Sequence, residues 1–370
     1  MDTASYEQQH LLVQARHALE TSHVSLAFQL CSQFLEKHPD DPIALELAAE
    51  IALDMDKDVQ AQAYLIKAID IAPDTGSGKF LMLAGLEQGH EAVRLYERGV
   101  ALLEQELIAL NNTPTNPSLQ GVAVVEEEEE EEDVLTQRRD MVRKAAEALV
   151  AATEIYLTDL CFEQDAEQRC EHYLTQALQL DPSCASAHAT LASVRLSQCR
   201  PDDARSSLQH SLALWNIHDP ESTPDTTPTY DSRLATAKLL LELDEDDVAL
   251  DVISGLEKED DLVPDIWYLY GFIYYRQGTL VNDDVLRRGE VWADAQECLM
   301  RAQELLQALQ EMDEVQVDLG MLEHTQELLN EVADVVKTWK KERRKLEKES
   351  LETAHDDVED IVTSDDDMED

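Results

Sequence analysis

Acidic residues recur at a four-residue spacing in two parts of this chain. The first set is Glu46, Glu50 and Asp54, and the second is Asp159 and Glu163. Residues four apart share one face of a helix, where like charges destabilise it by roughly a few tenths of a kcal/mol. A cationic partner would relieve that repulsion, so both sets predict sites that bind lysine and arginine side chains. The alternative interpretation is a solvated outer face.

Aromatic residues follow a similar pattern nearer the C-terminus. Tyr268, Phe272 and Tyr275 lie on one side of a predicted helix. Aromatic faces bind guanidinium groups and apolar side chains alike, and aromatic anchors concentrate binding energy at interfaces. We expect this stripe to face a groove at one end of an acidic trough. The alternative is that these rings belong to the core.

Residue patterns typical of enzymes are missing from the sequence. No glycine-rich phosphate loop of the type GxxxxGK[ST] occurs, and the 11 histidines are scattered. The six cysteines form no CxxC pair, which favours reduced thiols that pack as small apolar residues. We therefore predict no catalytic residue, no metal site, no cofactor and no enzymatic activity.

The elements that must position the acidic and aromatic residues repeat along the chain. Pro39 and Pro73 are 34 residues apart, and a small, large, small pattern precedes each. The matching residues are Ala27, Cys31 and Phe34 in the first copy, and Ala61, Leu65 and Ala68 in the second. That period predicts helix pairs, and a single pair cannot bury its apolar face without stacking on its neighbours. The sequence therefore predicts a solenoid with an extended binding surface.

The organisation predicted from end to end is all-α. Repeats are expected over 1–110 and 138–307, giving six or seven helix pairs in a right-handed superhelical solenoid. A disordered acidic loop, 111–137, contains NNTPTNPSLQG and the run Glu126–Asp133, and would separate the two sets of repeats. Capping helices are expected over 308–350, followed by a disordered acidic tail over 351–370.

Net charge narrows the choice of partner. The formal charge is -50, from 79 acidic and 29 basic residues, and it repels nucleic acid and anionic membranes. A basic protein partner is the natural inference, although acidity could serve solubility alone. Neither a secretion signal nor a membrane-spanning segment is predicted, which favours the cytoplasm and the nucleus.

One dense basic cluster interrupts this acidity. It comprises Lys340, Lys341, Arg343, Arg344 and Lys345. Two interpretations stay open: a nuclear-import signal, which would make an import receptor a further partner, or cations that suit the C-terminal end of a helix.

Several segments resemble the tetratricopeptide repeat (TPR), whose pattern is W-x2-LG-x2-Y followed by small, large and small residues and a proline. Its first helix is matched by Trp267, Gly271 and Tyr274, which the resemblance places in the core. Its second helix is matched by the residues ending at Pro73, and again by Leu174, Ala177 and Pro182.

The whole layout resembles the fungal family of TPR chaperones dedicated to large-subunit ribosomal protein L four. The resemblance is carried by acidic repeats, the internal run Glu126–Asp133 and the terminal acids. It implies a chaperone that shields a basic, disordered loop of a newly made ribosomal protein and escorts the protein to nuclear pre-ribosomes. We expect the chain to be a monomer. Two alternatives remain: a histone chaperone, and a TPR co-chaperone or adaptor of a heat-shock chaperone.

Overall fold

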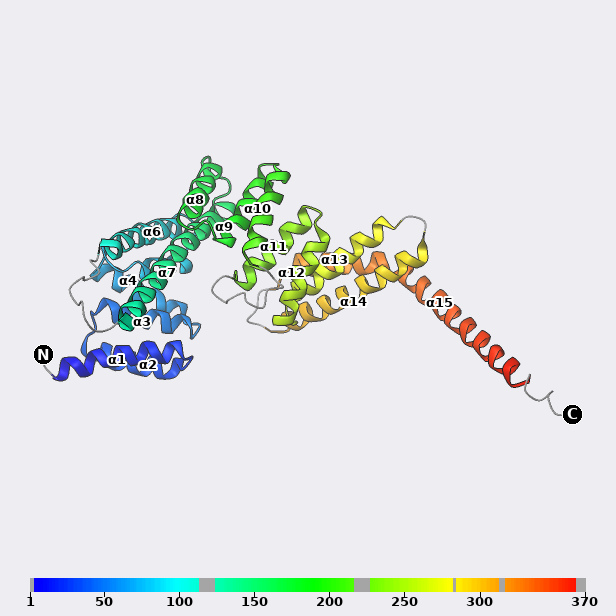
Figure 1. Cartoon of the computed structure of the whole chain (residues 1–370), viewed down its shortest axis with the longest axis horizontal. Coiled ribbons are helices and arrows are strands. Elements are labelled where there is room, and N and C mark those ends of the chain that lie inside the picture. The colour runs from blue at the N-terminus through cyan, green and yellow to red at the C-terminus, as the bar shows by residue number, and fades with distance from the viewer. Residues whose placement is uncertain (1–2, 113–123, 216–226, 282–283, 313–316, 364–370) are drawn as a thin grey trace. The chain divides into compact units, whose positions relative to one another are not determined.

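Helices are the only regular elements among the residues that the computed structural model describes, 3–112, 124–215, 227–281, 284–312 and 317–363. Within these ranges the chain forms seven consecutive helix pairs and a long last helix (Figure 1). The predicted all-α, TPR-like fold is confirmed. The first four pairs are α1 (Thr3–Glu20) with α2 (Val24–Lys37), α3 (Pro42–Leu53) with α4 (Asp58–Ile71), α5 (Gly78–Leu86) with α6 (Gly89–Asn112), and α7 (Val124–Leu157) with α8 (Ala166–Leu180).

The remaining pairs continue the same order along the chain. They are α9 (Ala185–Ser197) with α10 (Pro201–Leu214), α11 (Tyr230–Glu242) with α12 (Asp246–Glu259), and α13 (Pro264–Leu280) with α14 (Val285–Gln310). The last helix is α15 (Leu319–Thr363).

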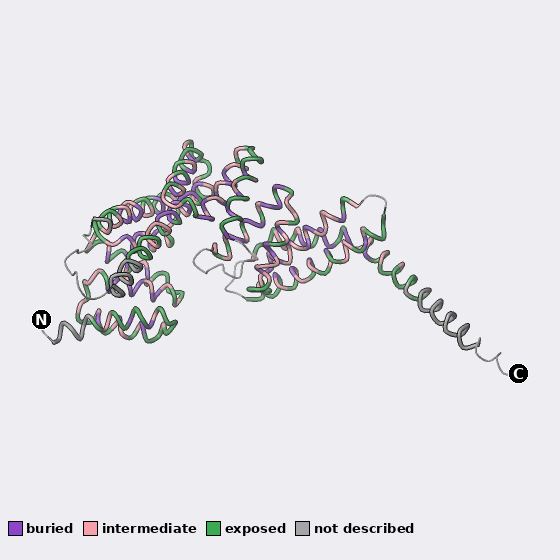
Figure 2. Tube along the Cα trace, viewed as in Figure 1, coloured by how far each residue is buried: buried purple, intermediate pink, exposed green. Residues whose placement is uncertain are grey.

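Small residues at regular positions let the helices of a pair approach closely. The small, large, small residues of α2 and α4 are all buried, and so are Leu174 and Ala177 of α8. Figure 2 shows buried positions as stripes along the helices, the pattern expected when one face of each helix packs on its neighbours. At the start of α3, Pro42 occupies the first turn, and the Asp41 carboxylate accepts a hydrogen bond from the Ala44 amide at 2.9 Å.

The turn inside a pair has a recurring backbone geometry. Five of the seven pairs place one residue of this turn in the left-handed region, with φ between 55° and 61°. These residues are Ser22, Asp56, Gly89, Cys199 and Asp244. Only one of the five is glycine, the residue that adopts this conformation without steric penalty. The turn geometry is therefore common to the repeats although its sequence is not.

The chain divides into two compact units, with α1–α10 in unit 1 and α11–α15 in unit 2. In unit 1, contacts join α1 to α3 and α3 to α5, and likewise α7 to α9, so these first helices lie next to one another. Leu81 of α5 also packs against the core formed by α6–α9. These first helices form the layer that we call the first-helix face of unit 1.

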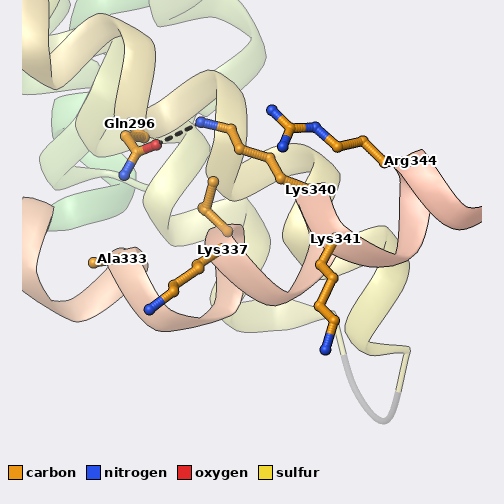
Figure 3. A pocket seen from close by; sticks show the side chains of 7 residues that line it. Gln296, Ala333, Lys337, Lys340, Lys341 and Arg344 are labelled. Carbon is orange, nitrogen blue, oxygen red and sulfur yellow. Dashed lines mark hydrogen bonds between the residues drawn. The ribbon is translucent and has the colours of Figure 1, made fainter.

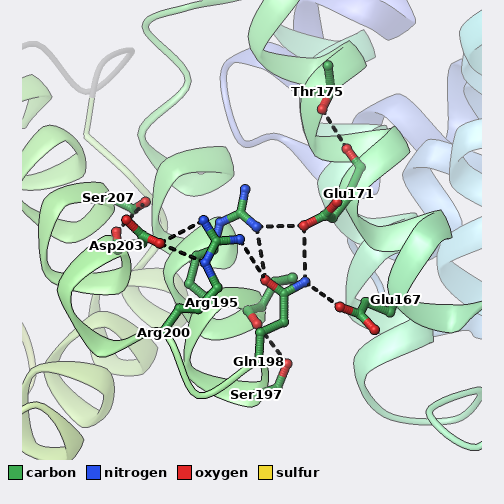
Figure 4. A network of polar contacts seen from close by, with 10 residues as sticks. Glu167, Glu171, Thr175, Arg195, Ser197, Gln198, Arg200, Asp203 and Ser207 are labelled. Atoms are coloured by element: carbon green, nitrogen blue, oxygen red, sulfur yellow. Dashed lines mark hydrogen bonds and ion pairs between the residues drawn. The ribbon is translucent and has the colours of Figure 1, made fainter.

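A polar network joins three helices on the surface of unit 1 (Figure 4). The Arg195 guanidinium of α9 donates to the Glu171 carboxylate of α8 at 2.5 Å. The Gln198 amide, at the end of α9, donates to Glu171 at 3.0 Å and to Glu167 at 2.9 Å. These hydrogen bonds, from Gln198 foremost and then Arg195, hold the pKa of the Glu171 carboxyl below its usual value. The network fixes the turn after α9 against α8.

Unit 2 ends in a helix that returns across its neighbours. α15 packs against α14 and also contacts α13. Helices α13 and α14 approach closely at Gly271, where an added Cβ would lie 2.5 Å from Cγ of Leu299. The resemblance placed Gly271 in the core, and this buried contact confirms it.

Segment boundaries differ from the sequence prediction at three places. Helix α7 begins at Val124, so Glu126–Asp133, expected in a loop, lies in its first turns. Glutamate has a high helix propensity, and acids near a helix N-terminus interact favourably with the dipole. α14 extends to Gln310, and α15 continues to Thr363, into the segment expected to be a disordered tail. Residues 113–123 and 364–370 lie outside the described residues.

Candidate partner-binding face

Glu46 and Glu50 lie half-buried on α3, within the first-helix face of unit 1. The Glu50 carboxylate is 3.4 Å from the Arg16 guanidinium of α1, and 41% of the Glu50 side chain remains exposed. Asp54, the third residue of the predicted set, is the exposed C-cap of α3. Of the three, Glu50 combines a position on this face with a carboxylate that reaches solvent.

Glu46 has a second role because it contacts the loop between α4 and α5. Its carboxylate lies over Gly78 and near Lys79, whose side chain is 2% exposed. The Lys79 ammonium donates to the carbonyl of Ala72 at 2.6 Å and to that of Thr75. Burial raises the pKa of the Glu46 carboxyl, while Lys79 and Arg16 oppose that rise. Glu46 is therefore part of the packing as well as of the acidic face.

Asp159 and Glu163 do not lie on a first helix, and that part of the prediction is corrected. Helix α7 ends at Leu157, so both are exposed residues of the loop that leads to α8. Asp159 accepts a hydrogen bond from the Gly89 amide at 3.3 Å, and the Glu163 carboxylate lies 3.4 Å from the His90 imidazole. Their four-residue spacing reflects a loop that contacts the α5–α6 turn. It does not reflect a helical face.

The aromatic stripe of α13 is covered by α15, which corrects the expectation of an open groove. Tyr268, Phe272 and Tyr275 pack against a cluster of Leu299, Leu328 and Leu329. The Tyr268 hydroxyl lies 2.8 Å from Nδ1 of His324. Tyr275 donates to the Glu331 carboxylate and stacks on Trp292 with ring centroids 5.8 Å apart. The sequence around α13 contains no signal that a helix more than 50 residues further along the chain packs over it, as the Tyr268–His324 contact shows.

Two further carboxylates belong to the first-helix face and were missed by sequence reasoning. Glu147 and Glu154 of α7 are both exposed, and their seven-residue spacing puts them on one side of the helix. Partial burial raises the pKa of each carboxyl. Glu154 also lies close enough to Tyr96 of α6 to help raise the pKa of its hydroxyl, after burial. The only sequence signal was an i, i+7 acidic pair, which any solvated helix also shows.

No family model matches the chain. A probable assembly chaperone of rpl4 from Schizosaccharomyces pombe is 31% identical over 270 residues, which cover 71% of this chain and 73% of that protein. The chain belongs to the family of these assembly chaperones.

A second relative and a solved structure support membership of this family. The probable assembly chaperone of rpl4 from Emericella nidulans is 30% identical over 278 residues, covering 71% of this chain and 63% of that protein. The structure of residues 1–338 of the assembly chaperone of RpL4, Acl4, is 32% identical, covers 74% of this chain and 97% of that one, and superposes with a TM-score of 0.63. The helical repeat fold is therefore the fold of the family.

The described residues also bear on metal binding and on membrane insertion. Across those ranges, no group of three histidine, cysteine or acidic side chains could hold a metal ion. None of the helices found there is long and apolar enough to cross a membrane. The relatives in this family are described as chaperones.

Proposed function

We propose that the chain is a dedicated assembly chaperone of ribosomal protein L4. It binds the newly made protein, shields a basic, disordered loop in an acidic concave groove, and escorts it to nuclear pre-ribosomes. The names of the family's relatives support this choice of client. The structural observation that carries it is a set of solvent-accessible carboxylates on the first helices α3 and α7, namely the half-buried Glu50 and the exposed Glu147 and Glu154. No catalytic step or cofactor is part of this function.

The physical basis is competition for cationic side chains. A free basic segment binds RNA through phosphate charge, and carboxylates that occupy its lysines and arginines suppress that binding. The formal charge of -50 steers a basic client toward the chain, so association should be fast and should weaken with salt. Release follows when ribosomal RNA outcompetes the carboxylates.

The test is binding of purified L4 to the chain and to two matched variants. The variant Glu50→Gln/Glu147→Gln/Glu154→Gln removes three charges from the first-helix face. A control, Glu36→Gln/Asp70→Asn/Asp251→Asn, removes three exposed charges from second helices. Titration calorimetry should show affinity lowered at least about tenfold by the first triple and about twofold or less by the control. Equal loss in both variants would show that net charge alone acts, without a face.

The client itself is tested by purifying the tagged chain from its own cells and identifying stoichiometric partners by mass spectrometry. Predominance of L4 supports the proposal. Predominance of histones or of a heat-shock chaperone would replace it with a histone chaperone or a TPR co-chaperone, while leaving the helical fold unchanged.

In the same proposal the chain acts as a monomer, is present in the cytoplasm and the nucleus, and enters the nucleus with an import receptor. Asp54 contributes acidic charge at the C-terminal end of α3. Sedimentation of the complex should give one chain per L4 molecule. Fluorescence microscopy of the tagged chain should show both compartments, and exclusion from the nucleus would contradict the escort role.

A further inference from the structure

A cationic pocket lies between α14 and α15, in unit 2, at a place where no acidic residue contributes to the lining (Figure 3). Its volume is about 480 Å³. Gln296 of α14 and Ala333 and Val336 of α15 line it together with four cations, Lys337, Lys340, Lys341 and Arg344. Such a concentration of positive charge is unexpected in a chain whose formal charge is -50.

Packing holds this part of α15 in helical form. Trp339 sits against Gly289 of α14, where an added Cβ would lie 2.7 Å from the indole Cγ. The Arg343 guanidinium lies 5.3 Å from the centre of the Trp339 ring, and Lys340 donates to the Gln296 amide oxygen at 3.0 Å. The cluster is thus presented as a rigid helical surface, whereas an import signal read as an extended chain would require this turn of α15 to unwind.

Three of the cations have no partner among the residues described. Lys337, Lys341 and Arg344 are exposed, and no ion pair or hydrogen bond within those ranges uses their side-chain nitrogens. Each side chain can therefore donate to an incoming carboxylate without breaking an existing interaction. Charge-assisted hydrogen bonds of this kind are about twice as strong as neutral ones.

We propose that this pocket binds a short acidic peptide segment of a second protein partner, distinct from the basic client. The cations from Lys337 to Arg344 span about 11 Å of helix at about 1.5 Å per residue. On α15, Asp334 and Glu331 lie three and six residues before Lys337, and Glu342 falls within the span but outside the pocket lining. A ligand of a few acidic residues matches this length of helix, whereas a longer polyanion such as RNA would extend past it toward Asp334 and Glu331.

The described part of the chain after the pocket leads away from it. The helix continues for 19 residues from Arg344 to Thr363, about 28 Å, as a single helix beyond α13 and α14 (Figure 1). A second copy of the chain is disfavoured because two molecules of charge -50 repel one another.

The test uses a fluorescein-labelled hexaglutamate peptide, with hexaglutamine as the uncharged control, and full-length protein in a fluorescence-polarisation titration. The variant Lys337→Glu/Lys341→Glu/Arg344→Glu reverses the three exposed cations. A matched control, Lys37→Glu/Lys258→Glu/Arg287→Glu, makes the same change in net charge at exposed sites elsewhere. We expect hexaglutamate alone to bind, with affinity lowered at least about tenfold by the first variant and about twofold or less by the control.

Other outcomes would overturn the proposal. Failure of wild-type protein to bind hexaglutamate at low ionic strength would do so, as would equal weakening by both variants. Tighter binding of a short RNA, lost in the pocket variant, would assign the pocket to nucleic acid. Concentration-dependent dimerisation in sedimentation, lost in the same variant, would assign it to a second copy. None of these results depends on L4, so they are separable from a failure of the proposed function.

Discussion

At the scale of single residues, two carboxylates of the acidic face, those of Glu147 and Glu154, are partly desolvated by the side chains around them. Glu154 is accessible to solvent, yet burial by surrounding side chains raises the pKa of its carboxyl. Burial raises the pKa of the Glu147 carboxyl in the same way. A charge kept in such surroundings destabilises the folded chain slightly, and a bound cation would offset that penalty. Glu171, which is held by Gln198 and Arg195, shows the opposite shift. The two kinds of carboxylate therefore have opposite effects on stability as pH changes.

The prediction at this scale concerns Glu154→Gln. Because the folded-state pKa of Glu154 lies above its unfolded value, the folded chain gains stability as pH falls through that raised pKa toward the unfolded one. We expect the variant to be slightly more stable than wild type near neutral pH, with a gap that closes as pH falls. Urea unfolding at a series of pH values measures this gap. Glu36→Gln, at an exposed site on α2, should show no such trend, and a gap that widens on acidification would contradict the assignment.

At the scale of elements, the turn between the two helices of a pair sets how they meet. Ser22, Asp56, Cys199 and Asp244 all hold positive φ, a conformation that costs an L-residue about 1–2 kcal/mol. Gly89 makes the same turn without that penalty. The geometry is retained in four pairs in spite of its cost, because the helices on both sides are fixed by their buried stripes.

Glycine at these turns should stabilise the chain. We expect Ser22→Gly and Cys199→Gly each to raise the free energy of unfolding by about 0.5–1 kcal/mol, since relief of strain exceeds the added entropy of the unfolded chain. Thermal melts followed by circular dichroism measure the change. Ser206→Gly, at an exposed site within α10, is the control and should lower stability by about 1 kcal/mol. Equal destabilisation by all three would mean that the turns are not strained.

At the scale of the whole molecule, net charge sets how fast the chain associates with a basic client. The eight acids of Glu126–Asp133 and the ten acids from Glu352 to Asp370 account for 18 of the 50 net negative charges, so 32 belong to the rest of the chain. The chain therefore attracts cations from a distance through its repeats as well as through these runs. Fields of this kind act on encounter rates more than on the lifetime of a complex.

Deleting residues 352–370 tests whether charge acts on the association rate rather than on the dissociation rate, with L4 as the proposed client. The net charge would change from -50 to -40. We expect the association rate with L4 to fall about two- to fivefold at low salt, with the dissociation rate within about twofold of wild type, as measured by stopped-flow fluorescence. A variant with 352–370 shuffled in sequence should associate at the wild-type rate. A dominant change in dissociation would instead show that this segment contacts the client directly.

The repeat spacing around Pro39 and Pro73, the acidity and the absence of strand patterns were enough to predict an all-α, TPR-like chain, because helix pairing depends on local apolar periodicity. The position of Glu46 and Glu50 on a first helix followed from the same periodicity. Tertiary structure alone decided that α15 covers Tyr268, Phe272 and Tyr275, since no local pattern encodes a contact with a distant helix. It also separated Asp159 and Glu163, in a loop, from Glu147 and Glu154, on a face. Residue spacing predicts which side chains share one side of a helix. Long-range contacts decide where the helix ends and what packs against it.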